Sequence, residues 1–185
     1  MDDIDSLMRR SPVIPVLIVE DPARAQPLAR ALVARGHPVL EVTLRTPAAL
    51  EVIAEMAKVE GAVVGAGTVL NPRDLENSLS AGARFIVSPG LTEPLARAAI
   101  ASGVPFLPGV ATAADIMRGL DLELDHFKFF PAVPAGGIPA LRALAAPFAQ
   151  CRFCPTGGIT EASAPDWLAL EPVLCVGGSW VAAGL

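Results

Sequence analysis

The stretch Asp125-His-Phe-Lys-Phe-Phe-Pro-Ala132 is typical of a short β-strand that ends at a proline. Side chains alternate between the two faces of a strand, so Lys128 and Phe130 share one face and the neighbouring phenylalanines share the other. The chain has two lysines, and Lys128 is the one that stands among apolar residues, where burying an ammonium group is costly. Two interpretations stay open. Lys128 pairs with a carboxylate or extends to solvent at the strand end, or its free amine attacks a carbonyl and forms a Schiff base.

Strands of the same kind recur along the chain and alternate with helical segments. They are short and apolar on both faces, as buried parallel strands are, and Asp21-Pro22 and Asn71-Pro72 have the residues that begin helices. We expect a short helix over residues 2–10 and a helix after each of the first seven strands. The eight expected strands cover residues 13–19, 39–44, 62–69, 84–88, 105–110, 126–130, 152–155 and 173–176.

Eight strand–helix units favour a closed (β/α)8 TIM barrel over an open doubly wound sheet. The open-sheet alternative is weakened because Gly65-Ala-Gly67, the only GxG in the chain, is followed by Leu70 where a dinucleotide fingerprint requires a third glycine. A chain of 185 residues with a hydrophobic fraction of 52% is long enough for one substantial core. We therefore predict an α/β protein with a single barrel domain over residues 1–185.

Charge and hydropathy exclude several classes of partner. The net charge of −5 is spread over many segments and forms no basic patch, so we expect no nucleic-acid partner. Arg9-Arg10 precedes an apolar run, as in an export signal, but aspartates lead the segment and Glu20-Asp21 ends the run early. Residues 131–150 are almost uncharged, yet they hold four prolines, so they are no membrane span. We expect a cytoplasmic protein that does not bind membranes.

Histidines, cysteines and carboxylates are not clustered with the spacing of metal ligands, so we expect neither a metal nor a cofactor. His37 and His126 are isolated and are predicted to be structural. Cys151 and Cys154 have the spacing of a redox pair, but they enter a strand, where three residues separate the Cα atoms by roughly 10 Å. That separation is too large for a disulfide, so we expect buried free thiols.

Polar residues gather at the carboxyl ends of the expected strands, where barrels have their active sites. Glu41 lies in an otherwise apolar strand, where a carboxylate is suited to proton transfer; the alternative is a structural ion pair with Arg45 or Lys128. Arg45 can hold a carboxylate by two parallel contacts, or it caps a helix. Thr68 either donates a hydrogen bond to the same carboxylate or caps the next helix.

Two glycine pairs follow the last two expected strands, at the place where barrels commonly bind phosphate. Gly157-Gly158 and Gly177-Gly178 allow backbone N–H groups to surround an anion, and Thr156 and Ser179 add hydroxyl donors. No arginine or lysine follows either pair. We therefore expect backbone dipoles and hydroxyl groups to hold most of a bound phosphate.

Six motifs together resemble the 2-keto-3-deoxy-6-phosphogluconate (KDPG) aldolases, a family that also cleaves 4-hydroxy-2-oxoglutarate. The motifs occur in the family's order and are Glu41-Val-Thr-Leu-Arg-Thr46, Gly65-Ala-Gly-Thr-Val-Leu-Asn-Pro72, Ser88-Pro-Gly-Leu-Thr92, Phe127-Lys-Phe-Phe-Pro-Ala132, Phe153-Cys-Pro-Thr-Gly-Gly-Ile159 and Gly177-Gly-Ser-Trp180. The resemblance implies a metal-independent class I aldolase, usually trimeric, with a role in the Entner–Doudoroff pathway. The chain departs from the family at Leu185, where family members continue into a closing helix, and we expect that helix to be missing.

The resemblance also implies a role for each candidate site residue. Lys128 is the Schiff-base lysine and Glu41 the general acid and base. Arg45 and Thr68 hold the pyruvyl carboxylate, and Pro89 and Phe130 form walls of the pocket. The residues implied to contact the phosphate are Thr156, Gly157, Gly158 and Ser179.

The expected reaction splits KDPG into pyruvate and glyceraldehyde 3-phosphate, and 4-hydroxy-2-oxoglutarate into pyruvate and glyoxylate. Three alternatives stay open: an aldolase for the galactonate-derived epimer, a sugar-phosphate isomerase on the same phosphate-binding barrel, and a sugar-phosphate-binding barrel without catalysis. An isomerase needs a second acid or base and no iminium, so it leaves Lys128 unexplained.

Overall fold

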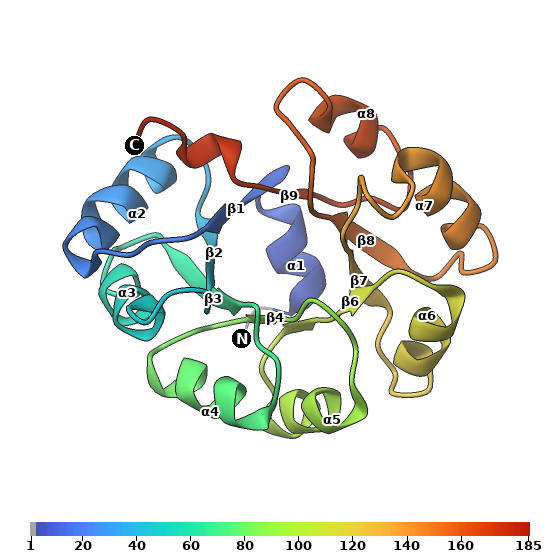
Figure 1. Cartoon of the computed structure of the whole chain (residues 1–185), viewed down its shortest axis with the longest axis horizontal. Helices are drawn as coiled ribbons and strands as arrows, with labels where there is room; N and C mark the ends of the chain where they lie inside the picture. The colour runs from blue at the N-terminus through green and yellow to red at the C-terminus, as the bar shows by residue number, and fades with distance from the viewer. Residues whose placement is uncertain (1–2) are drawn as a thin grey trace.

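The structure is a computed structural model that describes residues 3–185, in which parallel strands are flanked on the outside by helices (Figure 1). The strands are β1 (Val13–Leu17), β2 (Val39–Thr43), β3 (Val63–Gly67), β4 (Ile86–Val87), β5 (Phe106–Leu107), β6 (Gly109–Val110), β7 (His126–Phe129), β8 (Arg152–Pro155) and β9 (Val176–Gly178). The α-helices are α1 (Ile4–Arg9), α2 (Ala25–Ala34), α3 (Ala49–Met56), α4 (Pro72–Ser80), α5 (Glu93–Ser102), α6 (Ala113–Leu120), α7 (Gly137–Ala145) and α8 (Ala164–Leu168), and short 3-10 turns lie at Pro22–Arg24 and Trp180–Ala182.

The prediction of a closed eight-stranded barrel is wrong. The strands in the described part of the chain form a six-stranded sheet in the order β5-β4-β3-β2-β1-β9 and a three-stranded sheet in the order β6-β7-β8. One break lies at Pro108, inside the strand predicted over residues 105–110. Proline has no N–H to donate and ends a regular ladder, so β5 pairs with β4 in one sheet and β6 pairs with β7 in the other.

The second break separates β8 from β9. Two isolated bridges join the segments, Phe153 to Val173 and Thr156 to Gly177. The segment from Val173 to Gly177 has one residue more than the segment that it faces, which is the pattern of a bulge and interrupts a regular ladder. The two short segments therefore differ in length and meet without forming a continuous sheet.

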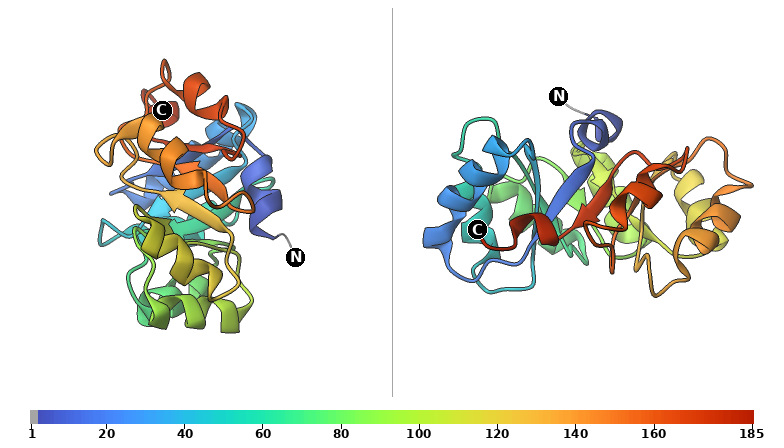
Figure 2. Two further views of the ribbon diagram at one scale, coloured as in Figure 1. Left: turned by 90° about the vertical axis from the view of Figure 1, so that its right-hand side faces the viewer. Right: turned by 90° about the horizontal axis from the view of Figure 1, so that it is seen from above.

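Helix α1 closes one end of the strand layer (Figure 2). Asp3 caps the helix by accepting a hydrogen bond from the Ser6 amide at 2.8 Å; Asp2, where the sequence predicts the helix to begin, lies outside the described residues. Leu7 and Met8 are buried in one apolar cluster with residues from the amino ends of β1, β2 and β3. Because α1 covers the amino ends, the carboxyl ends of the strands remain available for a site.

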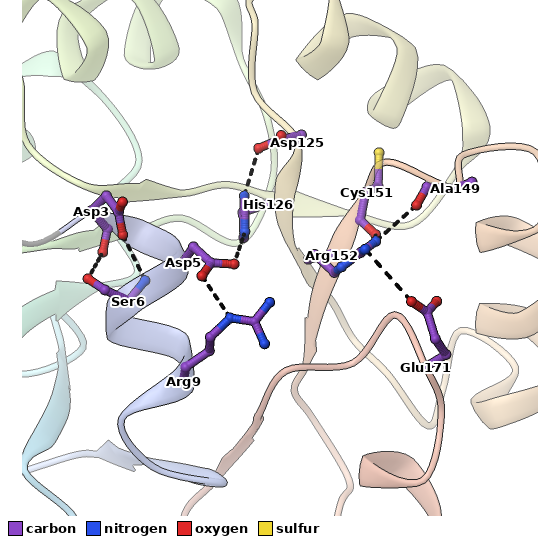
Figure 3. Close-up of polar contacts among 10 residues, drawn as sticks. All are labelled: Asp3, Asp5, Ser6, Arg9, Asp125, His126, Ala149, Cys151, Arg152 and Glu171. Carbon is purple, nitrogen blue, oxygen red and sulfur yellow. Dashed lines mark hydrogen bonds and ion pairs between the residues drawn. The ribbon is translucent and has the colours of Figure 1, made fainter.

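A polar cluster ties α1 to β7 (Figure 3). The Asp5 carboxylate lies 2.7 Å from Arg9 Nε and 3.1 Å from His126 Nε2, and the other ring nitrogen of His126 lies 2.7 Å from Asp125 Oδ1. The hydrogen bond from Arg9, and after it the contact with His126, lowers the pKa of Asp5 below its ordinary value. These contacts give His126 the structural position that the sequence predicts.

The other predicted helices are confirmed to within a few residues, because their proline and cap signals are local. Asn71 accepts a hydrogen bond from the Asp74 amide, and Thr112 and Asp115 form a reciprocal capping box at the start of α6. Among residues 3–185 we find no helix with both the length and the apolar content that crossing a membrane requires.

Candidate active site

An ion pair between Lys128 and Glu41 lies inside the fold. Lys128 belongs to β7 of the three-stranded sheet and Glu41 to β2 of the six-stranded sheet. The Lys128 Nζ atom lies 3.0 Å from Glu41 Oε1, and the two side chains are 7% and 4% exposed. The contact has the geometry of an ion pair, which is one of the interpretations that the sequence leaves open. The same geometry lets a proton pass directly between the amine and the carboxylate.

The alternation of β7 places Lys128 in this position. Phe127 and Phe129 are buried on the outer face of the strand, where their rings lie against Phe153 and Trp167. Lys128 therefore points inward, and its Nζ atom lies 5.3 Å from the centre of the Phe130 ring. An ammonium group near the face of an aromatic ring is stabilised electrostatically.

A cavity of about 630 Å³ opens at the carboxyl ends of β1, β8 and β9. Six of the predicted site residues line it, namely Arg45, Phe130, Thr156, Gly157, Gly158 and Ser179. Phe130 both lines the cavity and contacts Lys128, so it joins the ion pair to the cavity. The volume is in the range of cavities that bind small molecules.

Thr68 and Pro89 are not among the residues that line this cavity. Thr68 directly follows β3 and has a φ of 60°, a conformation that is strained for a β-branched residue. The carbonyl group of Pro89 packs against Gly109, which is the neighbour of Lys128 in the parallel ladder. Both residues are half-buried.

The glycine pairs form one wall of the cavity. Gly157 and Gly158 have φ values of 107° and 80°, which favour glycine. Thr156 is buried and faces Gly177, where a Cβ atom would lie 2.2 Å from the Thr156 hydroxyl oxygen. Ser179 is exposed at the rim. This wall presents backbone groups and two hydroxyl side chains to the cavity.

Two further polar side chains, Thr43 and Arg45, lie in or just after β2. Thr43 is buried, but its hydroxyl group donates a hydrogen bond to the Leu17 carbonyl at 2.9 Å, so it braces β2 against β1. Arg45 lies beyond the end of β2 and is exposed at the cavity rim. Of these three polar side chains, Glu41 is the one that contacts Lys128.

Sequence reasoning missed the contribution of the end of β1 and the segment that follows it. Residues 16–21 and Arg24 line the cavity, and Ile18 is 56% exposed there. The available signal was the sequence Glu20-Asp21-Pro22, a polar strand end followed by a helix start. A strand end and a helix start do not by themselves indicate that these side chains line a cavity.

Sequence reasoning also did not pair Cys154 with Cys175. All three cysteines are buried free thiols, as predicted for Cys151 and Cys154. The pKa of Cys175 is well above its ordinary value, first because of a hydrogen bond with Cys154 and then because of burial. The described residues contain no group of three or more His, Cys, Asp or Glu side chains arranged to hold a metal ion.

The fold and the site define a parallel α/β enzyme with an internal lysine–carboxylate pair beside a cavity, which is the arrangement expected of an aldolase that works through a Schiff base. A family model described as KDPG and KHG aldolase matches residues 4–184. The chain belongs to this family, and it is therefore a carbon–carbon lyase.

Individual relatives cover almost the whole chain. The 2-dehydro-3-deoxy-phosphogluconate aldolase of Zymomonas mobilis is 62% identical over 98% of this chain and 87% of its own length. The KHG/KDPG aldolase of Escherichia coli is 53% identical over 96% of this chain and 84% of its own length. A KDPG aldolase structure from Legionella pneumophila, with pyruvate captured as a covalent carbinolamine, has a TM-score of 0.95 and 44% identity over 99% of this chain and 89% of that one.

Proposed function

We propose that the chain is a class I aldolase that cleaves KDPG into pyruvate and glyceraldehyde 3-phosphate, and that 4-hydroxy-2-oxoglutarate is a second substrate. The observation that carries the proposal is the buried Lys128 amine, 3.0 Å from the Glu41 carboxylate and next to the cavity. The names of the relatives and the covalent pyruvate adduct of the Legionella protein support the same chemistry.

Lys128 is the proposed nucleophile. Its neutral amine attacks the C2 carbonyl of the substrate, and loss of water from the carbinolamine leaves a protonated imine. The imine withdraws the electron pair of the C3–C4 bond while Glu41 takes the proton of the C4 hydroxyl group. The bond breaks, the aldehyde leaves, and an enamine remains on Lys128. Protonation of the enamine at C3 and addition of water then release pyruvate and restore the amine.

Glu41 is the proposed proton carrier for these steps. Because its carboxylate lies within hydrogen-bond distance of Lys128 Nζ, it can receive a proton from the amine and return one to the carbinolamine oxygen. Its burial keeps water away from the transferred proton. The same carboxylate therefore serves both formation of the imine and cleavage of the carbon–carbon bond.

The remaining site residues are proposed to bind the two ends of the substrate. Arg45 and Thr68 hold the carboxylate of the pyruvyl group, and Pro89 and Phe130 bound the space around the reacting carbons. The phosphate is proposed to contact Thr156, Gly157, Gly158 and Ser179, which line one wall of the cavity. We also propose, from the resemblance to KDPG aldolases, that the protein works in the cytoplasm as a homotrimer.

The proposal is tested by measuring pyruvate release from KDPG with the wild-type protein and two matched lysine variants. Lys128→Arg keeps a positive charge but cannot supply a neutral amine, so it is expected to abolish turnover. Lys58→Arg is the control, because Lys58 is 59% exposed and pairs with Glu55 on a helix surface. Full activity in Lys128→Arg would contradict the proposal.

A further inference from the structure

Gly67, the last residue of β3, lies directly under the Glu41 side chain. A Cβ atom at this position would lie 2.2 Å from Glu41 Oε1, 2.7 Å from its Cγ and 2.8 Å from its carboxyl carbon. All three distances are shorter than real Cβ contacts. The carboxylate of Glu41 therefore occupies the space that any other residue's side chain would need.

The backbone at Gly67 does not itself require glycine. Gly67 is an extended strand residue and is not among the residues with positive φ, so its conformation is open to other amino acids. The three atoms nearest to a Cβ atom at this position all belong to Glu41. Gly67 can therefore be tested without introducing backbone strain.

The neighbouring glycine of β3 explains why Glu41 leans toward Gly67. In the parallel ladder Glu41 lies beside Gly65, and Thr43 lies beside Gly67. The space above Gly65 is filled by the Phe85 ring, which would lie 2.5 Å from a Cβ atom there. The Glu41 side chain therefore extends along its strand toward the carboxyl ends, where Lys128 Nζ meets it.

We propose that Gly67 is a positioning residue: because it has no side chain, the Glu41 carboxylate has the space to lie against Lys128. The catalytic role of this space rests on the proposed function. A methyl group at position 67 would need to push the carboxylate away by about 1 Å, and a misplacement of that size costs on the order of 10²-fold in rate.

The first test compares Gly67→Ala with Gly90→Ala, using steady-state cleavage of KDPG. A Cβ atom at Gly90 has no neighbour within 4 Å, so this control adds the same methyl group without a collision. Gly67→Ala is expected to lower kcat by roughly 10²-fold with little change in KM, because the displaced group acts in proton transfer rather than in binding. Gly90→Ala is expected to retain wild-type kcat. A fully active Gly67→Ala variant would overturn the inference.

The second test separates positioning of Glu41 from a general packing defect. Glu41→Asp removes one methylene group, so combining it with Gly67→Ala approximately conserves volume. In the Glu41→Asp background, Gly67→Ala should change kcat by a factor of about 3 or less. The shorter Asp side chain leaves room for the added methyl group, so the effects of the two substitutions are coupled. An equal loss in both backgrounds would show that Gly67 acts on something other than Glu41, and the inference would fail.

Folding and the proposed function are controlled separately. If Gly67→Ala alone does not fold, recovery of the thermal unfolding transition in the double variant supports the inference, and a double variant that is also unfolded overturns it. If the wild-type protein neither cleaves KDPG nor forms a borohydride-reducible adduct with pyruvate, the proposed function fails. If the wild type does both while Gly67→Ala remains fully active, only the role of Gly67 fails.

Discussion

Removing Lys128 should destabilise the protein through the partner that it leaves behind. In Lys128→Met the apolar chain is roughly preserved, but Glu41 keeps a carboxylate that is 4% exposed and has lost its donor at 3.0 Å. Breaking a buried ion pair by removing one partner typically costs 3–5 kcal/mol, so we expect a loss of about 3–5 kcal/mol. For a chain of this length that corresponds to a decrease in Tm of about 6–20 °C.

The assay is urea unfolding followed by circular dichroism, with the midpoint and slope compared between variants. The double variant Lys128→Met/Glu41→Leu removes both charges and should recover most of the loss, because replacing a whole buried pair by apolar residues is often neutral or stabilising. Wild-type stability in Lys128→Met would show that Glu41 is solvated after all. No recovery in the double variant would show that the loss came from packing and not from the uncompensated carboxylate.

Three further perturbations test other parts of the account. Glu41→Gln should slow KDPG cleavage by roughly 10²–10⁴-fold in steady-state assays, the usual contribution of general acid–base catalysis, and an unchanged rate would remove Glu41 from the mechanism. Ser179→Ala should lower kcat/KM for KDPG by roughly ten- to a hundredfold, since a hydrogen bond to a charged acceptor contributes about 1.5–3 kcal/mol. It should leave 4-hydroxy-2-oxoglutarate unaffected, and equal losses on both substrates would argue against a phosphate contact. Because the pKa of Asp5 is lowered by Arg9 and His126, its stabilising effect is present at neutral pH and disappears as the pH falls below about 4. Asp5→Asn should therefore lower Tm at pH 7 but converge with the wild type in acid, and a difference that does not change with pH would contradict this.

The strands and the inward position of Lys128 could be predicted because both depend on local alternation. Phe127, Lys128 and Phe129 alternate faces in any β-strand, whatever the sheet around them. The closure of the sheet could not be predicted in the same way, because it depends on pairing between distant strands. Pro108 carried a usable signal, since a proline inside a strand interrupts its ladder. The count of eight strand–helix units favours a closed barrel and does not register this break.

The sequence points to the candidate residues one at a time but does not give their arrangement. Glu41 and Lys128 each stand out as a charge in an apolar strand. Their pairing is one of several interpretations of the sequence, and the distance between Lys128 Nζ and Glu41 Oε1 in the structure selects it. Gly67 stands in the sequence within an incomplete nucleotide-binding motif and within one of the motifs shared with the aldolases, and neither motif indicates a contact with Glu41. Its contact with Glu41 depends on how two neighbouring side chains lean along their strands, and no spacing in the sequence encodes that direction.

The most direct test of the account is to incubate the protein with pyruvate, reduce with borohydride and map the modified peptide by mass spectrometry. The chain has two lysines, so the result is unambiguous. If Lys128 forms the imine, one pyruvyl unit is expected on the peptide that contains Lys128, with Lys58 unmodified. Labelling of Lys58 instead, or no labelling of a protein that cleaves KDPG, would contradict the central claim.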